Sequence, residues 1–178
     1  MQYRRALLAG ASYFFTVVTE QRRPVFAAEK EVNLLRDVFR EVRQRYPFQI
    51  DAAVVMPDHL HCIWTLPPGD ADYALRWRLI KTGFTKACDA SWRVPPPAAR
   101  QRKGQQSVWQ NRYWEHLLRD DDDFRRHVEY IHYNPVKHGL VAHARDWPYS
   151  SFLRYVRDGV YPLEWGADWA MTDDLGGE

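Results

Sequence analysis

Cysteine is scarce in this chain, and no long hydrophobic run is present. The 178 residues include two cysteines, Cys62 and Cys88, which are too few for a disulfide framework and fit a reducing compartment. No apolar run approaches the roughly 18 residues that a membrane-spanning helix needs. The basic and then apolar N-terminus is short and is interrupted by Gly10 and Ser12, which disfavours a signal peptide. We therefore expect a cytoplasmic protein with no membrane partner.

The length and the composition predict one soluble globular domain. The hydrophobic fraction is 46% and the charged fraction is 27%, which is ordinary for a folded protein and excludes intrinsic disorder as the main state. Aromatic residues reach 15%, with eight Trp and ten Tyr. No repeat is found, and the proline-rich and polar stretch 93–106 is interpreted as a loop.

The positive charge is unevenly distributed. Between residues 76 and 112, nine Lys and Arg accompany a single acid, Asp89. The same stretch carries four aromatic rings, Trp77, Phe84, Trp92 and Trp109. Single-stranded nucleic acid binds to such a mixture because cations contact its phosphates and rings stack on its bases. A solvated basic helix with its rings in the core would have the same composition, so both interpretations stay open here.

The hydrophobic periodicity predicts seven regular elements. Strands are expected where apolar and β-branched residues cluster, and helices where apolar residues recur every three or four positions. The expected strands are 12–19, 48–56, 59–66 and 113–119, and the expected helices are 29–46, 73–90 and 121–134. The first six elements follow the βαββαβ order of a ferredoxin-like α+β fold with an antiparallel sheet. We expect one domain over residues 1–140 and a C-terminal extension, residues 141–178, packed on it.

Two histidines stand one residue apart in the third expected strand, "HLHCIWTL". Side chains at positions i and i+2 of a strand point to the same face, so His59 and His61 project together and could hold one divalent ion. Leu60 and Cys62 point to the other face, which disfavours Cys62 as a nucleophile beside the pair. Histidines in a half-exposed strand with only a structural role remain the alternative at this stage.

Several well-known histidine motifs can be discarded. A metallo-hydrolase of the H-x-H-x-D-H kind needs Asp at position 63, and a histidine-triad transferase needs His there, but the residue is Ile63. A zinc deaminase needs H-x-E followed by C-x-x-C, and neither motif is present. A site built on two histidines therefore needs a further ligand from elsewhere in the chain.

The expected helix 121–134 carries two tyrosines and an asparagine. At about 100° per residue, Tyr130 lies at the border of the apolar stripe and Asn134 lies one turn further along the same face. Tyr133 points nearly the opposite way, toward solvent. If a tyrosine of this helix acts as a nucleophile, Tyr130 and Tyr133 are the two candidates. Pro135 disfavours helical geometry at the residue before it, so we expect the helix to end at Asn134.

A tyrosine beside a metal ion is a suitable nucleophile for a phosphodiester. Its hydroxyl is weakly nucleophilic because the unperturbed pKa is about 10, but a bound cation can polarise the phosphate and favour the phenolate. The covalent phosphotyrosine preserves the energy of the broken bond. No ATP site is required, and no G-x-x-x-x-G-K-[ST] motif is present.

Three blocks of sequence resemble one known family. "MPDHLHCIWTLP", "WQNRYWEHLLRDDDDFRRHVEYIHYNPVKHGLV" and "WPYSSF" together resemble the REP-associated tyrosine transposases. These form a branch of the single-tyrosine HUH transposases and carry an IS200-like domain. The resemblance covers residues 3–165. It implies a ferredoxin-like HUH domain that cleaves and rejoins single-stranded DNA at hairpins of repetitive extragenic palindromes, next to a short tetranucleotide, in the nucleoid.

The resemblance also implies roles for individual residues. His59 and His61 would bind Mg²⁺ or Mn²⁺, Tyr130 would form the 5′-phosphotyrosine, and Asn134 stands where related transposases place a polar third ligand. DNA contacts are expected from the N-terminus and from the basic stretch. The expected DNA-binding residues are Tyr3, Arg4, Arg5, Arg76, Arg78, Lys81, Arg100, Arg102, Lys103 and Arg112.

Two other functions and the oligomeric state stay open. A hairpin-binding protein with weak or lost catalysis would keep the fold, although it would not need His59, His61 and Tyr130 together. A nuclease that uses water would leave Tyr130 with a structural role. The chain could act as a monomer or as a homodimer, because insertion-sequence relatives are dimers whose tyrosine helix crosses to the partner.

Overall fold

A four-stranded antiparallel sheet forms the centre of the molecule. The computed structural model describes residues 7–95 and 108–166. The strands lie in the order β2-β3-β1-β4, and every neighbouring pair is antiparallel. Their bounds are β1 Ser12–Val18, β2 Gln49–Val55, β3 His59–Thr65 and β4 Trp114–Leu117. The expected ferredoxin-like α+β fold is confirmed.

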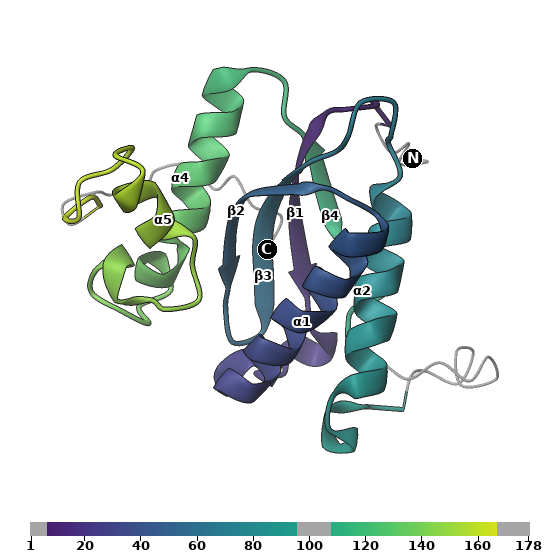
Figure 1. Cartoon of the computed structure of the whole chain (residues 1–178). Helices are drawn as coiled ribbons and strands as arrows, with labels where there is room; N and C mark the ends of the chain where they lie inside the picture. Colours follow the sequence, from purple (N-terminus) through teal and green to yellow (C-terminus); the bar gives the residue numbers. More distant parts are fainter. Residues whose placement is uncertain (1–6, 96–107, 167–178) are drawn as a thin grey trace, which may run out of the picture.

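Two helices, α1 (Glu29–Arg45) and α2 (Tyr73–Ala87), cover one face of the sheet. Figure 1 shows them side by side in front of the strands. The larger core lies beneath them, where Trp64 of β3 stacks on Trp77 of α2 with ring centroids 4.3 Å apart. Asp72 caps the start of α2, because its side chain accepts a hydrogen bond from the Leu75 amide, the usual N-cap arrangement. Among the described helices, none is long and apolar enough to cross a membrane.

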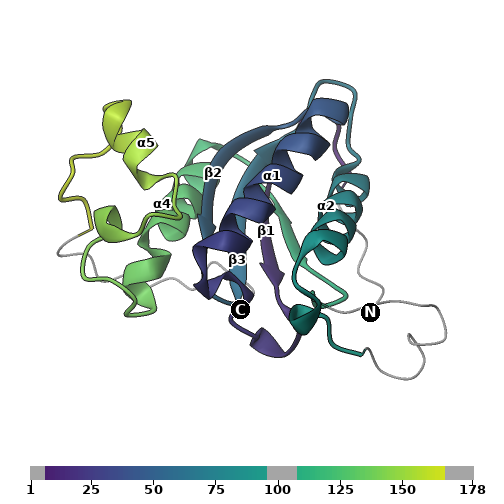
Figure 2. The ribbon, with the colours of Figure 1, turned by 60° about the horizontal axis from the view of Figure 1, so that its bottom comes forward.

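Helix α4 (Asp121–Lys137) packs on the opposite face of the sheet. Asp120 caps its start, because the Asp120 side chain accepts a hydrogen bond from the Asp123 amide. Three acids follow in the first turn, where the helix dipole favours negative charge. Val128 and Ile131 pack against apolar residues of the sheet, including Phe14. The views in Figures 1 and 2 agree that α4 lies beside β2, away from α1 and α2. This helix places its inner face against the histidine pair of β3.

The expected end of this helix at Asn134 is wrong. Helix α4 continues to Lys137 with Pro135 inside it. Proline removes one backbone donor, but its fixed φ near −65° fits a helix. The last turn is closed by later donors instead, since the His138 amide donates to the Asn134 carbonyl and the Leu140 amide donates to the Pro135 carbonyl, both at 3.0 Å. The proline therefore costs one hydrogen bond and does not end the helix.

The C-terminal segment returns to the sheet along β2. The Val55 amide donates to the Tyr149 carbonyl and the Ser151 amide donates to the Ala53 carbonyl, each at 2.8 Å. The Trp147 indole adds a third bond to the Val55 carbonyl, at 3.0 Å. Helix α5 (Phe152–Arg157) follows and lies on the far side of α4 from α1 and α2 in both views (Figures 1 and 2).

Candidate active site

His59 and His61 both point from β3 toward α4. Their side chains are buried, and their ring centroids lie 4.8 Å apart. Leu60 and Cys62 belong to the core on the other face, beneath α1 and α2. The alternation that the sequence predicted is therefore confirmed: the two imidazoles share one face of the sheet.

The Nδ1 atom of each imidazole is held by a neighbouring side chain. His59 Nδ1 lies 2.6 Å from Asp58 Oδ1, and His61 Nδ1 lies 2.9 Å from Thr16 Oγ1 on β1. Such outer contacts are typical of metal-binding histidines, because they fix the ring and direct Nε2 toward the ion. His59 Nε2 is buried and has no hydrogen-bond partner among the described residues. This atom is suited to a ligand that the protein itself does not supply.

Asp58 is held as a carboxylate. Its pKa is lowered chiefly by the hydrogen bond to His59, with burial opposing the shift and the Arg22 guanidinium at 3.2 Å adding to it. A carboxylate accepts a hydrogen bond and does not donate one. His59 therefore carries its proton on Nδ1, which leaves the lone pair of Nε2 available to a cation.

Tyr130 brings a hydroxyl-bearing ring to the same place. Its side chain is fully buried, which is deeper than the border position expected from the helical periodicity. The ring meets His61 nearly edge to face with centroids 5.2 Å apart, and it packs against Phe14 at 6.0 Å. Tyr133 is half-buried, and its ring lies beside Gly166. The ring of Tyr130 thus contacts the histidine pair directly.

The last turn of α4 adds more polar groups. Asn134 is fully buried and follows Tyr130 by one helical turn, as the sequence predicted. Lys137 Nζ lies 3.5 Å from the Tyr130 hydroxyl, and the His138 ring centroid lies 5.5 Å from that of His59. The C-terminal end of α4 thus brings Lys137 next to Tyr130, and His138, which follows the helix, next to His59.

Cys62 plays no part in this arrangement. It lies in the opposite core, and burial raises the pKa of its thiol well above the ordinary value. A protonated thiol is a poor nucleophile. The structure agrees with the prediction that Cys62 faces away from the histidine pair.

The expectation that Arg76 contacts DNA is wrong. Its side chain is 2% exposed and forms an ion pair with Asp70 at 2.6 Å. The guanidinium also donates to the backbone carbonyls of Tyr46, Pro47 and Asp72. These contacts hold the loop before α2 against the segment that follows α1. The guanidinium is therefore buried and bonded within the protein and is not accessible to a phosphate.

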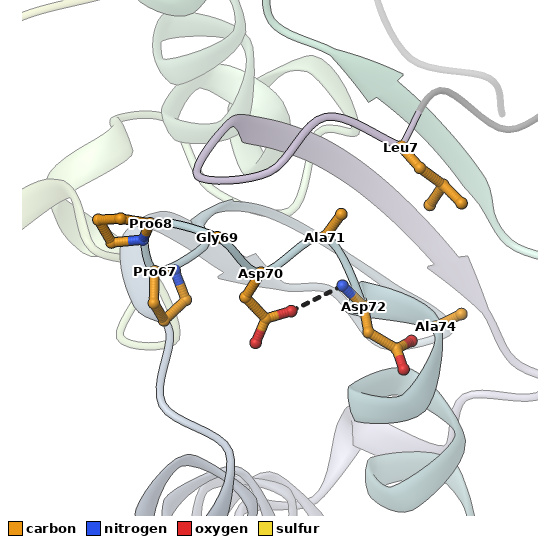
Figure 3. Close-up of a pocket in the computed structure, with 8 residues that line it drawn as sticks. All are labelled: Leu7, Pro67, Pro68, Gly69, Asp70, Ala71, Asp72 and Ala74. Atoms are coloured by element: carbon orange, nitrogen blue, oxygen red, sulfur yellow. Dashed lines mark hydrogen bonds between the residues drawn. The ribbon is translucent and has the colours of Figure 1, made fainter.

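A surface hollow lies at this loop. Figure 3 shows it between Leu7 and the residues that lead into α2, with the Asp72 amide donating to Asp70 across the loop at 2.8 Å. The charged side chains drawn there, Asp70 and Asp72, are both acidic. Negative charge repels a phosphate, so this hollow is a poor place for nucleic acid.

The other expected DNA-binding residues divide into two groups. Arg78 and Arg112 are exposed, whereas Lys81 is half-buried and donates to the Gln110 carbonyl at 2.9 Å. Their contacts with DNA stay a prediction. The remaining six lie outside the described residues: Tyr3, Arg4, Arg5, Arg100, Arg102 and Lys103.

A second cluster of imidazoles and a carboxylate joins β4 to α4. The ligand atoms of His116, Asp123 and His127 all lie within 4.8 Å of one another. The Asp123 carboxylate contacts His116 Nε2 at 2.9 Å and His127 Nδ1 at 3.2 Å, and the two imidazoles stack. Burial acts to raise the pKa of Asp123, but the hydrogen bonds from His116 and the Arg119 amide leave it lowered. Because these groups bind one another, we interpret the cluster as a clamp at the start of α4.

Sequence reasoning missed three residues of the site. Asp58 and Thr16 hold the imidazoles, and Lys137 contacts the Tyr130 hydroxyl. Asp58 directly precedes the pair, which is a usable signal. Thr16 is opposite His61 only through the register of β1 against β3, and no local pattern shows that.

Comparison with known proteins agrees with the fold and identifies the family. Residues 8–134 match the family described as "Transposase IS200 like". The chain is 44% identical over 177 residues to the REP-associated tyrosine transposase of Escherichia coli (strain K12), covering 99% of this chain and 96% of that protein. A second relative, from Haemophilus influenzae, is 41% identical over 166 residues. The match covers 93% of this chain and 93% of that protein.

A solved structure of a relative matches the whole chain. It is described as a REP-associated tyrosine transposase bound to a REP hairpin, and it is 43% identical. The TM-score is 0.84, with coverage of 100% of this chain and 97% of that chain. The family match and the fold place this chain in the IS200-like class of transposases. The chain belongs to that family and, within it, to the REP-associated tyrosine transposases.

Proposed function

We propose that this transposase cleaves and rejoins single-stranded hairpin DNA of the REP type through a 5′-phosphotyrosine on Tyr130. The observation that supports it best is the contact between the Tyr130 ring and His61, whose neighbour His59 presents a buried Nε2 atom without a hydrogen-bond partner in the described part of the chain. The candidate nucleophile and the candidate metal site therefore lie next to each other, between β3 and α4. The solved relative bound to a REP hairpin supports the substrate class.

His59, His61 and Asn134 would hold the divalent metal, Mg²⁺ or Mn²⁺. The donor set is two imidazole nitrogens and one amide oxygen. Mn²⁺ accepts both kinds of ligand, whereas Mg²⁺ prefers the oxygen. The Nδ1 contacts to Asp58 and Thr16 supply the outer shell that orients the imidazoles. When bound, the metal acts as a Lewis acid on the phosphate and stabilises its developing charge.

The chemistry assigned to the chain itself is a transesterification. The Tyr130 oxygen attacks the phosphorus, an O–P bond to tyrosine forms, and the bond from phosphorus to the 3′ oxygen breaks. The phenolic proton goes to water, and the released 3′ oxygen takes a proton from water. Attack by a 3′ hydroxyl on the phosphotyrosine reverses the step and rejoins DNA, so the bond energy is kept without ATP.

The DNA would be held by the basic stretch and the N-terminus. Arg78, Lys81 and Arg112 are the described members of that set, and the cations would neutralise phosphates of the hairpin and of its flanking tetranucleotide. We further propose that the protein acts in the cytoplasm at the nucleoid, as a monomer or a homodimer. Both statements follow from the substrate class and from the resemblance to related transposases.

A covalent trapping experiment tests the proposal. Wild-type protein, Tyr130→Phe and Tyr133→Phe are incubated with a 5′-unlabelled, 3′-labelled REP-type hairpin and Mn²⁺, then separated on a denaturing gel. Wild type and Tyr133→Phe should carry the label as a protein–DNA adduct, while Tyr130→Phe should bind the hairpin and carry none. An adduct on Tyr130→Phe would overturn the nucleophile. Binding without any adduct or cleavage in the wild type would favour a hairpin-binding protein, and cleavage without an adduct would favour a nuclease that uses water.

A further inference from the structure

The side chain of Lys137 folds back onto Tyr130. Its Nζ atom lies 3.5 Å from the Tyr130 hydroxyl and 4.9 Å from the centroid of the Tyr130 ring. The two residues are seven positions apart on α4, which is about two helical turns and places them on one face. A lysine in the last turn is favoured by the helix dipole, but the dipole does not require its ammonium group to contact a buried phenol.

The backbone at Lys137 is fixed. Lys137 is the last residue of α4, and the His138 amide that follows it donates to the Asn134 carbonyl at 3.0 Å. Gly139 has a φ of +67°, which only glycine adopts without strain, and its amide donates to the Val136 carbonyl at 2.9 Å. This glycine end cap holds the lysine stem where the ammonium reaches the tyrosine.

We propose that Lys137 is a further catalytic residue, which donates a hydrogen bond to the attacking oxygen of Tyr130 and offers positive charge to the phosphate that this oxygen attacks. The inference rests on the proposed function, because it takes Tyr130 as the nucleophile. Nothing in the sequence pattern alone pointed to it, since a lysine ends many helices.

The ammonium group acts as a donor and as a charge, not as a base. As the bond from the Tyr130 oxygen to phosphorus forms and the bond to the 3′ oxygen breaks, the tyrosine proton goes to water and the 3′ oxygen takes a proton from water. Lys137 keeps its own protons throughout. Its hydrogen bond strengthens as negative charge grows on the tyrosine oxygen, because charge-assisted bonds are shorter and stronger than neutral ones. The separation of 3.5 Å is long for a hydrogen bond and leaves room for that contraction.

The geometry separates this role from simple DNA binding. A lysine that only binds backbone phosphates contributes to affinity and to its salt dependence. A lysine aimed at the reacting oxygen contributes to the rate of the bound complex, since its interaction is stronger in the transition state than in the ground state. Rate and affinity must therefore be measured separately.

The first experiment compares Lys137→Met, Lys137→Arg and the control Lys30→Met, an exposed lysine on α1 at the other face of the sheet. Formation of the covalent adduct is followed in single turnovers at saturating hairpin with Mn²⁺, and hairpin affinity is measured by fluorescence anisotropy. We expect Lys137→Met to slow adduct formation by about 100-fold and to change the affinity by less than about tenfold. Lys137→Arg should recover most of the rate, and Lys30→Met should match wild type. Circular dichroism and a thermal melt confirm that each variant is folded, and Lys137→Gln repeats the test if the methionine variant is not.

A second substrate identifies the oxygen that Lys137 serves. In a hairpin with sulfur in place of the bridging 3′ oxygen, the leaving group departs without assistance. The defect of Lys137→Met should persist on this substrate, because the lysine assists the attacking oxygen. A defect that disappears would assign Lys137 to the leaving group and overturn the inference.

The outcomes separate the inference from the proposed function. No adduct with wild-type protein would refute the function and the lysine role together. An adduct that forms at the wild-type rate in Lys137→Met would refute the lysine role alone. A loss of affinity with an unchanged rate at saturating hairpin would leave Lys137 as a phosphate contact and also refute it.

Discussion

The ring of Tyr130 meets the imidazole of His61 nearly edge to face, with centroids 5.2 Å apart and an angle of 73° between the planes. His61 lies on β3, and Tyr130 lies on α4, which covers the face of the sheet opposite α1 and α2. Phe14 stands behind both, at 5.5 Å from His61 and 6.0 Å from Tyr130. Close packing of three rings restricts side-chain motion. The proposed nucleophile and one proposed metal ligand are therefore held in place by packing within the protein itself.

Removing the imidazoles should abolish metal binding and cleavage together. The double variant His59→Ala, His61→Ala is expected to lose Mn²⁺ binding, measured by electron paramagnetic resonance, and to lose cleavage. Its hairpin affinity should stay close to wild type, because the proposed phosphate contacts lie on other residues. Wild-type protein in excess EDTA should be equally inactive and should recover when Mn²⁺ is added in excess. Cleavage that persists in EDTA would contradict the metal requirement.

Thr16→Val should weaken metal binding without touching a ligand. The Thr16 hydroxyl contacts His61 Nδ1 at 2.9 Å, and losing such an outer contact typically lowers metal affinity by about 10- to 100-fold. Valine keeps the shape and the strand preference, so the fold should be retained. Mn²⁺ titration measures the effect, with Thr82→Val on the exposed side of α2 as the matched control. Equal Mn²⁺ affinity in both variants would show that Thr16 does not support the site.

Arg76 and Arg78 should behave in opposite ways although they are two residues apart. Arg76→Met removes a buried guanidinium and should lower the free energy of unfolding by about 2–3 kcal/mol, below the range for fully buried pairs because Asp70 is partly exposed. Arg78→Met on the exposed side should leave stability within about 0.5 kcal/mol and reduce the slope of log affinity against log salt by about one.

Urea unfolding measures the first effect, and anisotropy at several salt concentrations measures the second. A reduced salt slope for a folded Arg76→Met would restore Arg76 as a phosphate contact. An unchanged slope for Arg78→Met would remove Arg78 from the DNA-binding surface.

His132 should make the protein less stable in acid. Burial, with a smaller contribution from the charge of Arg154, lowers its pKa to about 3, and its ring packs against Tyr155 and Tyr161 while Nε2 contacts the Ser151 hydroxyl. Between pH 3 and the ordinary histidine pKa of about 6.5, the unfolded chain binds a proton that the folded chain excludes. Stability from this group is complete above pH 6.5 and falls by about 1.4 kcal/mol per pH unit below it.

The measurement compares wild type with His132→Gln by urea unfolding from pH 7.5 to 4.5. Glutamine cannot take up the proton, so the variant should show a weaker loss of stability as the pH falls. Parallel curves for the two proteins would show that His132 does not cause the acid sensitivity.

The sequence allowed the fold to be predicted because local periodicity and connection order determine it. Strand alternation placed His59 and His61 on one face, and helical spacing placed Tyr130 and Asn134 on the same side of α4. These predictions depend on residues close in sequence. The contact of Thr16 with His61 depends on how two distant segments align, and composition carries no information about it.

Two predictions, the DNA contact of Arg76 and the helix end before Pro135, were wrong. Arg76 falls on the same helical stripe as Tyr73, Trp77 and Ile80, all buried in α2, so its position indicated burial although its charge suggested solvent. Pro135 predicts a helix end at Asn134, yet the cost of one missing hydrogen bond is small where the next carbonyls find donors. In both cases tertiary packing outweighed the preference of a single residue.

The return of the C-terminal segment along β2 has a consequence for association. The strand order makes β2 an outer strand of the sheet, and an outer strand with unpaired amides and carbonyls recruits strands from other molecules. Residues 147–151 form hydrogen bonds with backbone groups of Ala53 and Val55, so these groups are not available to a strand of another molecule. The tail therefore protects this border of the sheet, and a second copy that extended the sheet would have to join at β4. A chain shortened before Trp147 should lose that protection and become prone to aggregation.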